Sequence, residues 1–243
     1  MNNKSRSSLV VTGTDTGVGK SIITAGLVRE LHLKEIRAAG LKPVETGCAY
    51  AEDHNLIASD GALLNASAPW VPANTVAPYR FAPPIAPAIA ARKAGIQLQL
   101  QDLVDVIEQA RHYADFLVIE GAGGALSPLT ESNNTLDLAA KLAAPVLVCA
   151  KDTLGTQSQT LAVLEAARQR NLDVLGVVLT RFEEDELVGM QDNAATIHEW
   201  GKVEVFQYIP AFEGDAAAQV QATGPHLTQI GLTQRVVDLS ASN

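Results

Sequence analysis

A short apolar run that leads into a glycine-rich turn constrains this chain more than any other part of its sequence. Residues 9–12 predict a buried strand, which is followed directly by Gly13-Thr14-Asp15-Thr16-Gly17-Val18-Gly19-Lys20-Ser21. Glycines in such a turn let several backbone N–H groups point into one concavity, and the next helix presents its positive dipole end there. The pattern predicts a phosphate-binding loop in which Lys20 reaches the β- and γ-phosphates and the Ser21 hydroxyl binds Mg²⁺.

The loop departs from the usual spacing at one position. The common pattern, Gly-x4-Gly-Lys-Ser/Thr, would place its first glycine at Thr14, whereas this sequence has Gly13 one residue earlier. A strand–turn–helix whose glycines serve only packing is the alternative interpretation. The strand before the loop, the helix after it and the Lys-Ser ending together favour a phosphate site.

Charge, cysteine content and hydropathy exclude several classes of protein. The chain has 243 residues, 47% hydrophobic and 19% charged, with a formal net charge of −9. This acidic balance argues against nucleic acid as the main partner, although a local nucleotide site is compatible with it. Cys48 and Cys149 belong to no metal-ligand or disulfide pattern, the five histidines are scattered, and no run resembles a signal core or membrane helix. We expect a cytoplasmic enzyme with small-molecule substrates and no membrane partner.

Short apolar runs alternate with helical patterns along the chain, which is typical of a parallel sheet with crossover helices. Residues 100–110 and the segment after Gly155 have helical spacing, residues 68–87 predict an irregular connection, and residues 214–243 have a weak helical pattern. We expect one domain over residues 1–243, an α/β P-loop NTPase fold whose mostly parallel central sheet has helices on both faces. The strands are expected at 9–12, 38–44, 116–120, 146–150, 175–180 and 205–209.

Two polar residues at the expected strand ends are the main candidates for chemistry, because an open parallel sheet binds its ligands there. Lys42 lies in the second strand, where an ammonium is costly unless it meets an anion, and beside a phosphate loop it can stabilise charge developing at the γ-phosphate. Glu120 closes the third strand, where NTPases hold Mg²⁺ directly or through water. The alternatives are a lysine that reaches solvent and a glutamate that caps a turn.

Three further positions are ambiguous on the residues alone. Asp60 starts a plausible helix, and its simplest interpretation is an N-cap. Thr46 either contacts a polar substrate or caps a turn. The helix start at residues 155–158 either binds a carboxylate or is simply capped.

Taken in order, these motifs resemble those of the dethiobiotin synthetases. The resemblance extends from Val11 to about Pro210, and no single motif is specific, but the combination is. Asp15 matters because the family has Thr-Asp-Thr here, whereas related partition and nitrogenase-type ATPases have a signature lysine at that position. The motifs are Thr-Gly-Thr-Asp-Thr-Gly-Val-Gly-Lys-Ser, Gly-Leu-Lys-Pro-Val-Glu-Thr-Gly, Ser-Asp-Gly-Ala-Leu, Glu-Gly-Ala-Gly-Gly and Leu-Gly-Thr.

The resemblance implies a homodimer, with its site at the subunit interface, that uses ATP and Mg²⁺ to join CO₂ to 7,8-diaminononanoate. One amine captures CO₂ as a carbamate, the carbamate attacks the γ-phosphate to give a mixed anhydride, and the second amine closes the ureido ring and expels phosphate. Such a site has to hold the carbamate in line with the γ-phosphate, neutralise the charge that develops during transfer, and exclude water from the mixed anhydride.

The resemblance also implies roles for particular residues. Lys20 and Lys42 would hold the phosphates and the developing charge, with Thr16 beside them. Mg²⁺ would be ordered by Ser21, Asp60 and Glu120. The substrate would contact Thr46 and, from the other subunit, the helix start at Gly155, Thr156 and Ser158. The nucleotide would be bound by Gly17, Val18, Gly19, Lys20, Ser21, Ile22, Asp60, Glu120, Gly121, Ala122, Gly123, Thr180, Pro210 and Ala211, and Gly123 would also line the substrate pocket.

The chain departs from the family at two of these positions. Thr180 replaces an asparagine that reads adenine in many members, and a hydroxyl lacks the paired donor and acceptor of an amide. We therefore expect loose base selection, so that other nucleoside triphosphates also serve. Ser158-Gln159 replaces an Asn-His pair, which weakens the assignment of contacts to the substrate carboxylate.

Two other functions compete with this one. A ligase of the same fold, such as the synthetase part of cobyrinic acid diamide synthetase, normally has a glutaminase domain with a nucleophilic cysteine, and neither Cys48 nor Cys149 lies in such a motif. A partition-type switch ATPase that binds a surface or polymer is disfavoured by Asp15 and by the acidic balance of the chain.

Overall fold

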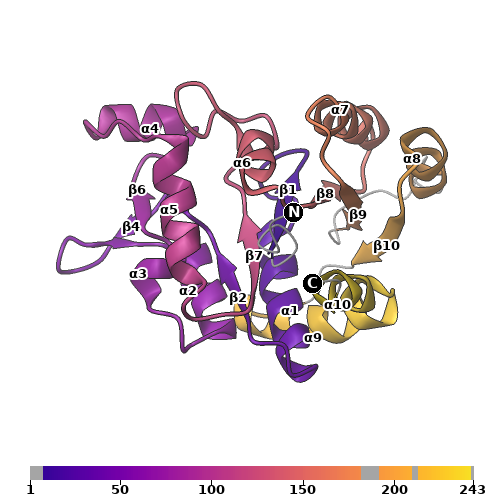
Figure 1. Ribbon diagram of the computed structural model, residues 1–243, viewed down its shortest axis with the longest axis horizontal. Coiled ribbons are helices and arrows are strands. Elements are labelled where there is room, and N and C mark those ends of the chain that lie inside the picture. Colours follow the sequence, from indigo (N-terminus) through magenta and orange to yellow (C-terminus); the bar gives the residue numbers. More distant parts are fainter. Residues whose placement is uncertain (1–7, 182–191, 210–212, 242–243) are drawn as a thin grey trace.

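A six-stranded parallel sheet forms the centre of the computed structural model, which describes residues 8–181, 192–209 and 213–241 (Figure 1). The strands lie in the order β10-β9-β8-β1-β7-β2. Every residue of β1 and β7 is buried, as expected for central strands that are covered on both faces. The strands are β1 (Ser8–Gly13), β2 (Ala38–Leu41), β7 (Phe116–Glu120), β8 (Val146–Lys151), β9 (Val174–Thr180) and β10 (Val205–Ile209).

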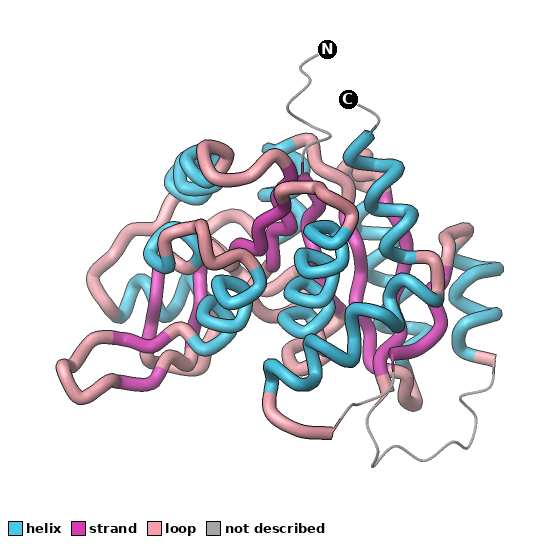
Figure 2. The backbone as a smooth tube through the Cα atoms, turned by 90° about the horizontal axis from the view of Figure 1, so that it is seen from below, coloured by secondary structure: helices cyan, strands magenta, loops and turns pink. Residues whose placement is uncertain are grey.

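Helices cover both faces of this sheet. In Figure 1, α6 (Thr135–Leu142), α7 (Thr156–Arg168) and α8 (Asn193–Gly201) lie above it, whereas α1 (Lys20–Leu33), α9 (Ala216–Gln229) and α10 (Leu232–Ala241) lie below. Figure 2, seen from below, shows helices in front of the strands. The predicted α/β architecture is confirmed. The remaining helices are α2 (Ser59–Ser67), α3 (Ala73–Val76), α4 (Pro87–Lys93) and α5 (Leu100–Ala110).

The C-terminal segment is more ordered than its weak helical pattern predicts. Its two helices, α9 and α10, pack against α1. Leu27 of α1 and Leu227 of α9 are fully buried, and a Cβ added at Gly26 would lie 3.2 Å from the Leu227 side chain. Close packing on α1 therefore holds α9 in place although Pro225 lies inside it.

The strand predicted at residues 38–44 is wrong in its second half. β2 ends at Leu41, and the next strand, β3 (Val44–Thr46), pairs with β6 (Tyr79–Phe81) instead of the central sheet. Pro43 has no N–H to donate to a ladder, and the N–H of Lys42 donates to the carbonyl of Val76 at 2.9 Å. Lys42 thus lies just beyond the carboxyl end of an edge strand.

The connection predicted as irregular over residues 68–87 also contains regular elements. It includes α3, β6 and the first residue of α4. Together with the hairpin of β4 (Ala49–Tyr50) and β5 (Leu56–Ile57), these elements extend the molecule beyond β2, on the left in Figure 1. The segment between β6 and α4, with Pro87 at the start of α4, lines the cavity described below.

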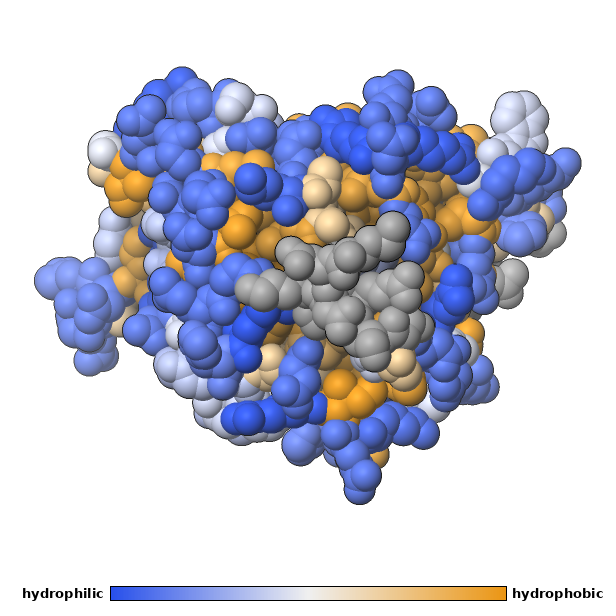
Figure 3. Space-filling model, in the orientation of Figure 1, coloured by the Kyte–Doolittle hydropathy of each residue, from blue (hydrophilic) through white to orange (hydrophobic). Residues whose placement is uncertain are grey.

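On the face seen in Figure 3, hydrophilic side chains dominate the periphery, and apolar side chains show mainly toward the middle. Within the described ranges, no helix combines the length and the apolar character needed to cross a membrane.

Candidate active site

The phosphate loop predicted from the sequence connects β1 to α1. Gly17 and Gly19 have φ angles of 74° and 83°, in the left-handed region that glycine adopts without strain. Gly19 is the N-cap of α1, and none of the described side chains caps this helix. The N–H groups of its first turn therefore face out of the helix end, where an anion can accept from them.

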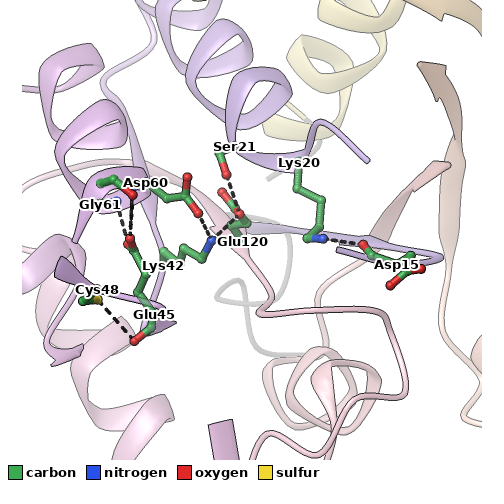
Figure 4. A network of polar contacts seen from close by, with 10 residues as sticks. Asp15, Lys20, Ser21, Lys42, Glu45, Cys48, Asp60, Gly61 and Glu120 are labelled. Atoms are coloured by element: carbon green, nitrogen blue, oxygen red, sulfur yellow. Dashed lines mark hydrogen bonds and ion pairs between the residues drawn. The ribbon is translucent and has the colours of Figure 1, made fainter. Parts of the chain in front are cut away.

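Lys20 is the first residue of α1, and its side chain folds back over the loop (Figure 4). Its Nζ donates to the backbone carbonyl of Asp15 at 2.7 Å. Burial lowers the pKa of Lys20 below its ordinary value, because the ammonium is largely removed from water. An anion bound in the loop would offset this desolvation.

A second lysine lies in a buried cluster beside the loop (Figure 4). Lys42 donates to a carboxylate oxygen of Asp60 and, at 2.9 Å, to Oε1 of Glu120. The Ser21 hydroxyl donates to the same Glu120 oxygen at 2.9 Å. Burial alone would lower the pKa of Lys42, but the charges of Glu120 and Asp60 outweigh it and raise the pKa above its ordinary value. The structure thus brings together four predicted site residues from α1, β7, α2 and the end of β2.

Ser21, Asp60 and Glu120 form a donor set that fits Mg²⁺. Hydroxyl and carboxylate oxygens are the ligands this ion takes. The second oxygen of Glu120, Oε2, is buried and has no hydrogen-bond partner among the described residues, a costly state that a cation would relieve. The described part of the chain contains no group of three or more His, Cys, Asp or Glu suited to a metal. Phosphate and water oxygens would have to complete the coordination, as is usual for Mg²⁺.

Asp60 is the second residue of α2, so the prediction of an N-cap is wrong by two positions: Ala58 occupies the cap. Glu45 of β3 faces this helix start from the side (Figure 4). Its carboxylate is buried, and burial raises its pKa above the ordinary value. Glu45 lies in one of the predicted motifs but had no predicted role, because its contact with α2 depends on where β3 lies.

A cavity of about 290 Å³ opens beside Lys42. Six of its lining residues were predicted as site residues: Thr16, Lys42, Thr46, Asp60, Ala122 and Gly123. The largely apolar part formed by Pro84, Ile85, Ala86 and Pro87 was missed, although Pro83-Pro84-Ile85-Ala86-Pro87 is a conspicuous sequence. Ser127, which was also missed, completes the lining.

The glycines after Glu120 allow two segments to approach each other closely. A Cβ at Gly121 would lie 2.4 Å from the Thr135 side chain. Gly123 has a φ angle of 72°, and a Cβ there would lie 2.7 Å from the Ser127 hydroxyl. Both positions therefore require glycine for packing, whatever they contribute to ligand binding.

The start of α7 lies outside this cavity. Gly155, with a φ angle of 88°, is the N-cap of α7, and Leu154 before it is 93% exposed. The hydroxyl of Thr156 is buried without a partner among the described residues, and its N–H donates to the Thr153 carbonyl at 3.1 Å. Ser158 is exposed. None of the three predicted residues lines the cavity of its own chain, and their role in substrate binding stays a prediction.

Thr180 ends β9 and directs its hydroxyl at the backbone. Its Oγ1 lies 3.2 Å from the Val18 carbonyl and 3.3 Å from the Ala150 carbonyl, and it can donate to either of them. Asp152, which had no predicted role, lies beside it. The N–H of Asp152 donates to the Thr180 carbonyl at 2.7 Å, and its buried carboxylate accepts from Arg181 and Asn193. Pro210 and Ala211, predicted to line the base pocket, lie outside the described residues.

Comparison with known proteins agrees with this geometry. A protein of Anaeromyxobacter dehalogenans named ATP-dependent dethiobiotin synthetase BioD is 39% identical over 219 residues, which are 89% of this chain and 95% of that protein. The chain belongs to the dethiobiotin synthetase family. A family member of the same name from Ralstonia nicotianae is 34% identical over 78% of this chain and 82% of its own length. A family model described as "AAA domain" matches residues 7–215. The resemblance drawn from the motifs is confirmed, and with it the prediction of a ligase.

Solved structures show the same fold. A ParA family ATPase from Chlorobium tepidum TLS matches with a TM-score of 0.54 at 12% identity, covering 97% of this chain and 99% of that chain. The MinC:MinD cell division protein complex from Aquifex aeolicus matches with a TM-score of 0.52 at 14% identity, covering 97% and 94%. The P-loop NTPase fold is confirmed, and at these identities the likeness extends to the fold alone. It gives no support to a partition-type function.

Proposed function

We propose that this chain is an ATP- and Mg²⁺-dependent ligase that carboxylates 7,8-diaminononanoate with CO₂ and closes the ureido ring of dethiobiotin, releasing ADP and phosphate. The position of Lys42 is the observation that carries the proposal. Its ammonium lines the cavity and shares Glu120 with Ser21 of the phosphate loop. A cation placed there can stabilise charge between a substrate in the cavity and a γ-phosphate on the loop.

The composition of the cavity supports a substrate with an aliphatic chain and polar reacting groups. Pro84, Ile85 and Pro87 offer an apolar wall to the chain, and Thr46 and Ser127 offer hydroxyls that can accept from amines. The amines would then lie next to Lys42, at the end of the cavity nearest the phosphate loop.

The reaction needs little acid–base chemistry from the protein. One amine adds to CO₂ and loses a proton, which leaves a carbamate whose oxygen Lys42 can hold toward the γ-phosphate. As the carbamate oxygen forms its bond to phosphorus, the bond to ADP breaks, and Lys20 and the N–H groups of residues 17–22 stabilise the charge on the phosphates. The second amine then attacks the carbonyl of the mixed anhydride, so that a second C–N bond forms and phosphate and a proton leave. When Mg²⁺ is bound, Ser21, Asp60 and Glu120 would hold it where it neutralises part of the charge on the phosphates.

Our proposal includes a homodimer in which each subunit completes the site of the other. The helix start at Gly155, Thr156 and Ser158 lies outside its own cavity, and the neighbouring Leu154 is 93% exposed, which suits burial by a second copy. The N–H groups at this helix end would receive the substrate carboxylate. Since every substrate is a small molecule, we place the single-domain enzyme in the cytoplasm, with no nucleic-acid or membrane partner.

Phosphate release, measured with each of four components left out in turn, tests this function. We expect release to require ATP, Mg²⁺, the diamine and bicarbonate together. Mass spectrometry should detect as much dethiobiotin as phosphate released. Release that needs glutamine would point to an amide-forming ligase. Release stimulated by DNA or lipid without the diamine would point to a switch ATPase.

A further inference from the structure

The helix that carries Asp60 begins without a cap from its own sequence. Ala58 is the N-cap of α2, and none of the described side chains adjacent to it in sequence takes over this role. Glu45 of β3, which is 3% exposed, caps the helix instead. Its Oε1 accepts from the N–H of Asp60 at 3.0 Å and its Oε2 from the N–H of Gly61 at 2.8 Å, while the Ser59 hydroxyl lies 3.4 Å from Oε1.

These two N–H groups belong to the peptide units on either side of the Asp60 Cα. Tying both units to one carboxylate fixes the orientation of that Cα and hence the direction of the Asp60 side chain. The fit is close, because a Cβ at Gly61 would lie 2.6 Å from the Cβ of Ala77 and 3.4 Å from Oε2 of Glu45. The Asp60 carboxylate then reaches Lys42 and remains 38% exposed toward the cavity that it lines.

We propose that Glu45 is a positioning residue: by binding both N–H groups that flank the Asp60 Cα, it holds the Asp60 carboxylate toward Lys42 and the Mg²⁺ site. The inference rests on the proposed Mg²⁺ site. It extends that site to a buried carboxylate that does not line the cavity. A cap that only stabilised α2 would affect unfolding but not the metal.

Glu45→Gln is the variant that separates these two roles. It preserves size and one acceptor oxygen but turns an amide donor toward an N–H group. We expect it to weaken Mg²⁺ binding to the enzyme–AMP-PNP complex by about tenfold or more, as loss of a supporting hydrogen bond does at metal sites. Isothermal titration calorimetry with MgCl₂ measures this affinity. The dissociation constant of AMP-PNP in EDTA should change by less than about twofold, whereas a tenfold change corresponds to ~1.4 kcal/mol.

Glu30→Gln is the matched control. Glu30 is also a buried carboxylate, 6% exposed, and it accepts from the Thr228 hydroxyl at 2.9 Å near the far end of α1. This variant should lower the free energy of unfolding yet leave the Mg²⁺ dissociation constant unchanged.

A double-mutant cycle with Asp60→Asn shows whether Glu45 acts through Asp60. We expect Glu45→Gln to add no further loss of Mg²⁺ affinity once Asp60 has become Asn. Additive losses, or wild-type Mg²⁺ affinity in Glu45→Gln, would overturn the proposal while leaving the proposed function intact. If wild-type enzyme itself binds no Mg²⁺ with the nucleotide, the proposed function loses its metal site and this inference falls with it. If neither Glu45→Gln nor the charge-preserving Glu45→Asp folds, Glu45 supports the whole domain, and its specific role at Asp60 is refuted.

Discussion

Lys42 and Glu120 form a buried ion pair, with Nζ 2.9 Å from Oε1 and side chains that are 9% and 0% exposed. Removing two charges from water costs several kcal/mol per ion, so such a pair persists only where further polar partners share it. Asp60 and Ser21 are those partners. The arrangement keeps Lys42 charged next to the cavity.

Replacing Lys42 tests its part in the reaction. Lys42→Ala should reduce the rate of phosphate release by about 100-fold or more, because a cation that stabilises transition-state charge is lost. It should also lower the free energy of unfolding by about 3 kcal/mol, since two carboxylates lose their buried counter-charge. Steady-state assays and urea unfolding measure the two effects. Lys141→Ala, at an exposed position of α6, is the control, and near-normal turnover in Lys42→Ala would remove this lysine from the mechanism.

Glu120 is the residue on which we expect the metal requirement to depend most. Its Oε2 is buried and lacks a hydrogen-bond partner among the described residues, which suits a ligand. Chelation of Mg²⁺ with EDTA should abolish phosphate release, and Glu120→Gln should raise the Mg²⁺ concentration for half-maximal rate by about tenfold or more. Glu131→Gln, in an exposed pair with Arg92, should not change it. An unaltered Mg²⁺ dependence in Glu120→Gln would show that this carboxylate is no ligand.

Base selection should be loose because Thr180 directs its hydroxyl at backbone carbonyls. Without an amide at this position, no side chain of β9 offers the paired donor and acceptor that distinguish adenine from other bases. We expect kcat/KM for ATP, CTP and GTP to agree within about tenfold, a difference of ~1.4 kcal/mol or less. Rates that differ by several orders of magnitude would contradict this prediction.

Elements that depend on short stretches of sequence were predicted well. The bounds expected for β7, β10 and α5 match the structure, because each contains a compact apolar pattern. The turn between β1 and α1 and the position of Glu120 at the end of β7 were also predicted correctly, and the binding roles of these residues stay predictions.

Features that depend on long-range contacts were not predictable in the same way. The pairing of β3 with β6 joins residues 44–46 to residues 79–81, and the sequence of neither segment identifies the other as its partner strand. The same pairing places Glu45 beside α2, and it places residues 84–87, which follow β6, beside Lys42. The sequence therefore predicted neither contact. The pattern of α9 is weakened by Pro225, and only its packing on α1 shows why the helix forms there.

Cys149 should be an unreactive thiol in the native protein. It is fully buried in β8, and its carbonyl accepts from the N–H of Thr14 in the phosphate loop at 2.9 Å. Burial raises the pKa of Cys149 from 9.0 to about 12, so the thiolate that reacts is absent at pH 8.

Labelling with DTNB measures this reactivity. Cys48→Ser leaves Cys149 as the remaining thiol, and we expect its labelling at pH 8 to be at least about 100-fold slower in buffer than in urea, because reaction has to await local opening. The folded state also retains this proton where the unfolded chain releases it, so stability should fall as the pH rises from 9.0 toward about 12. Cys149→Ala should lack that part of the pH dependence. Rapid labelling in buffer would mean that β8 opens next to the phosphate loop far more often than its packing allows.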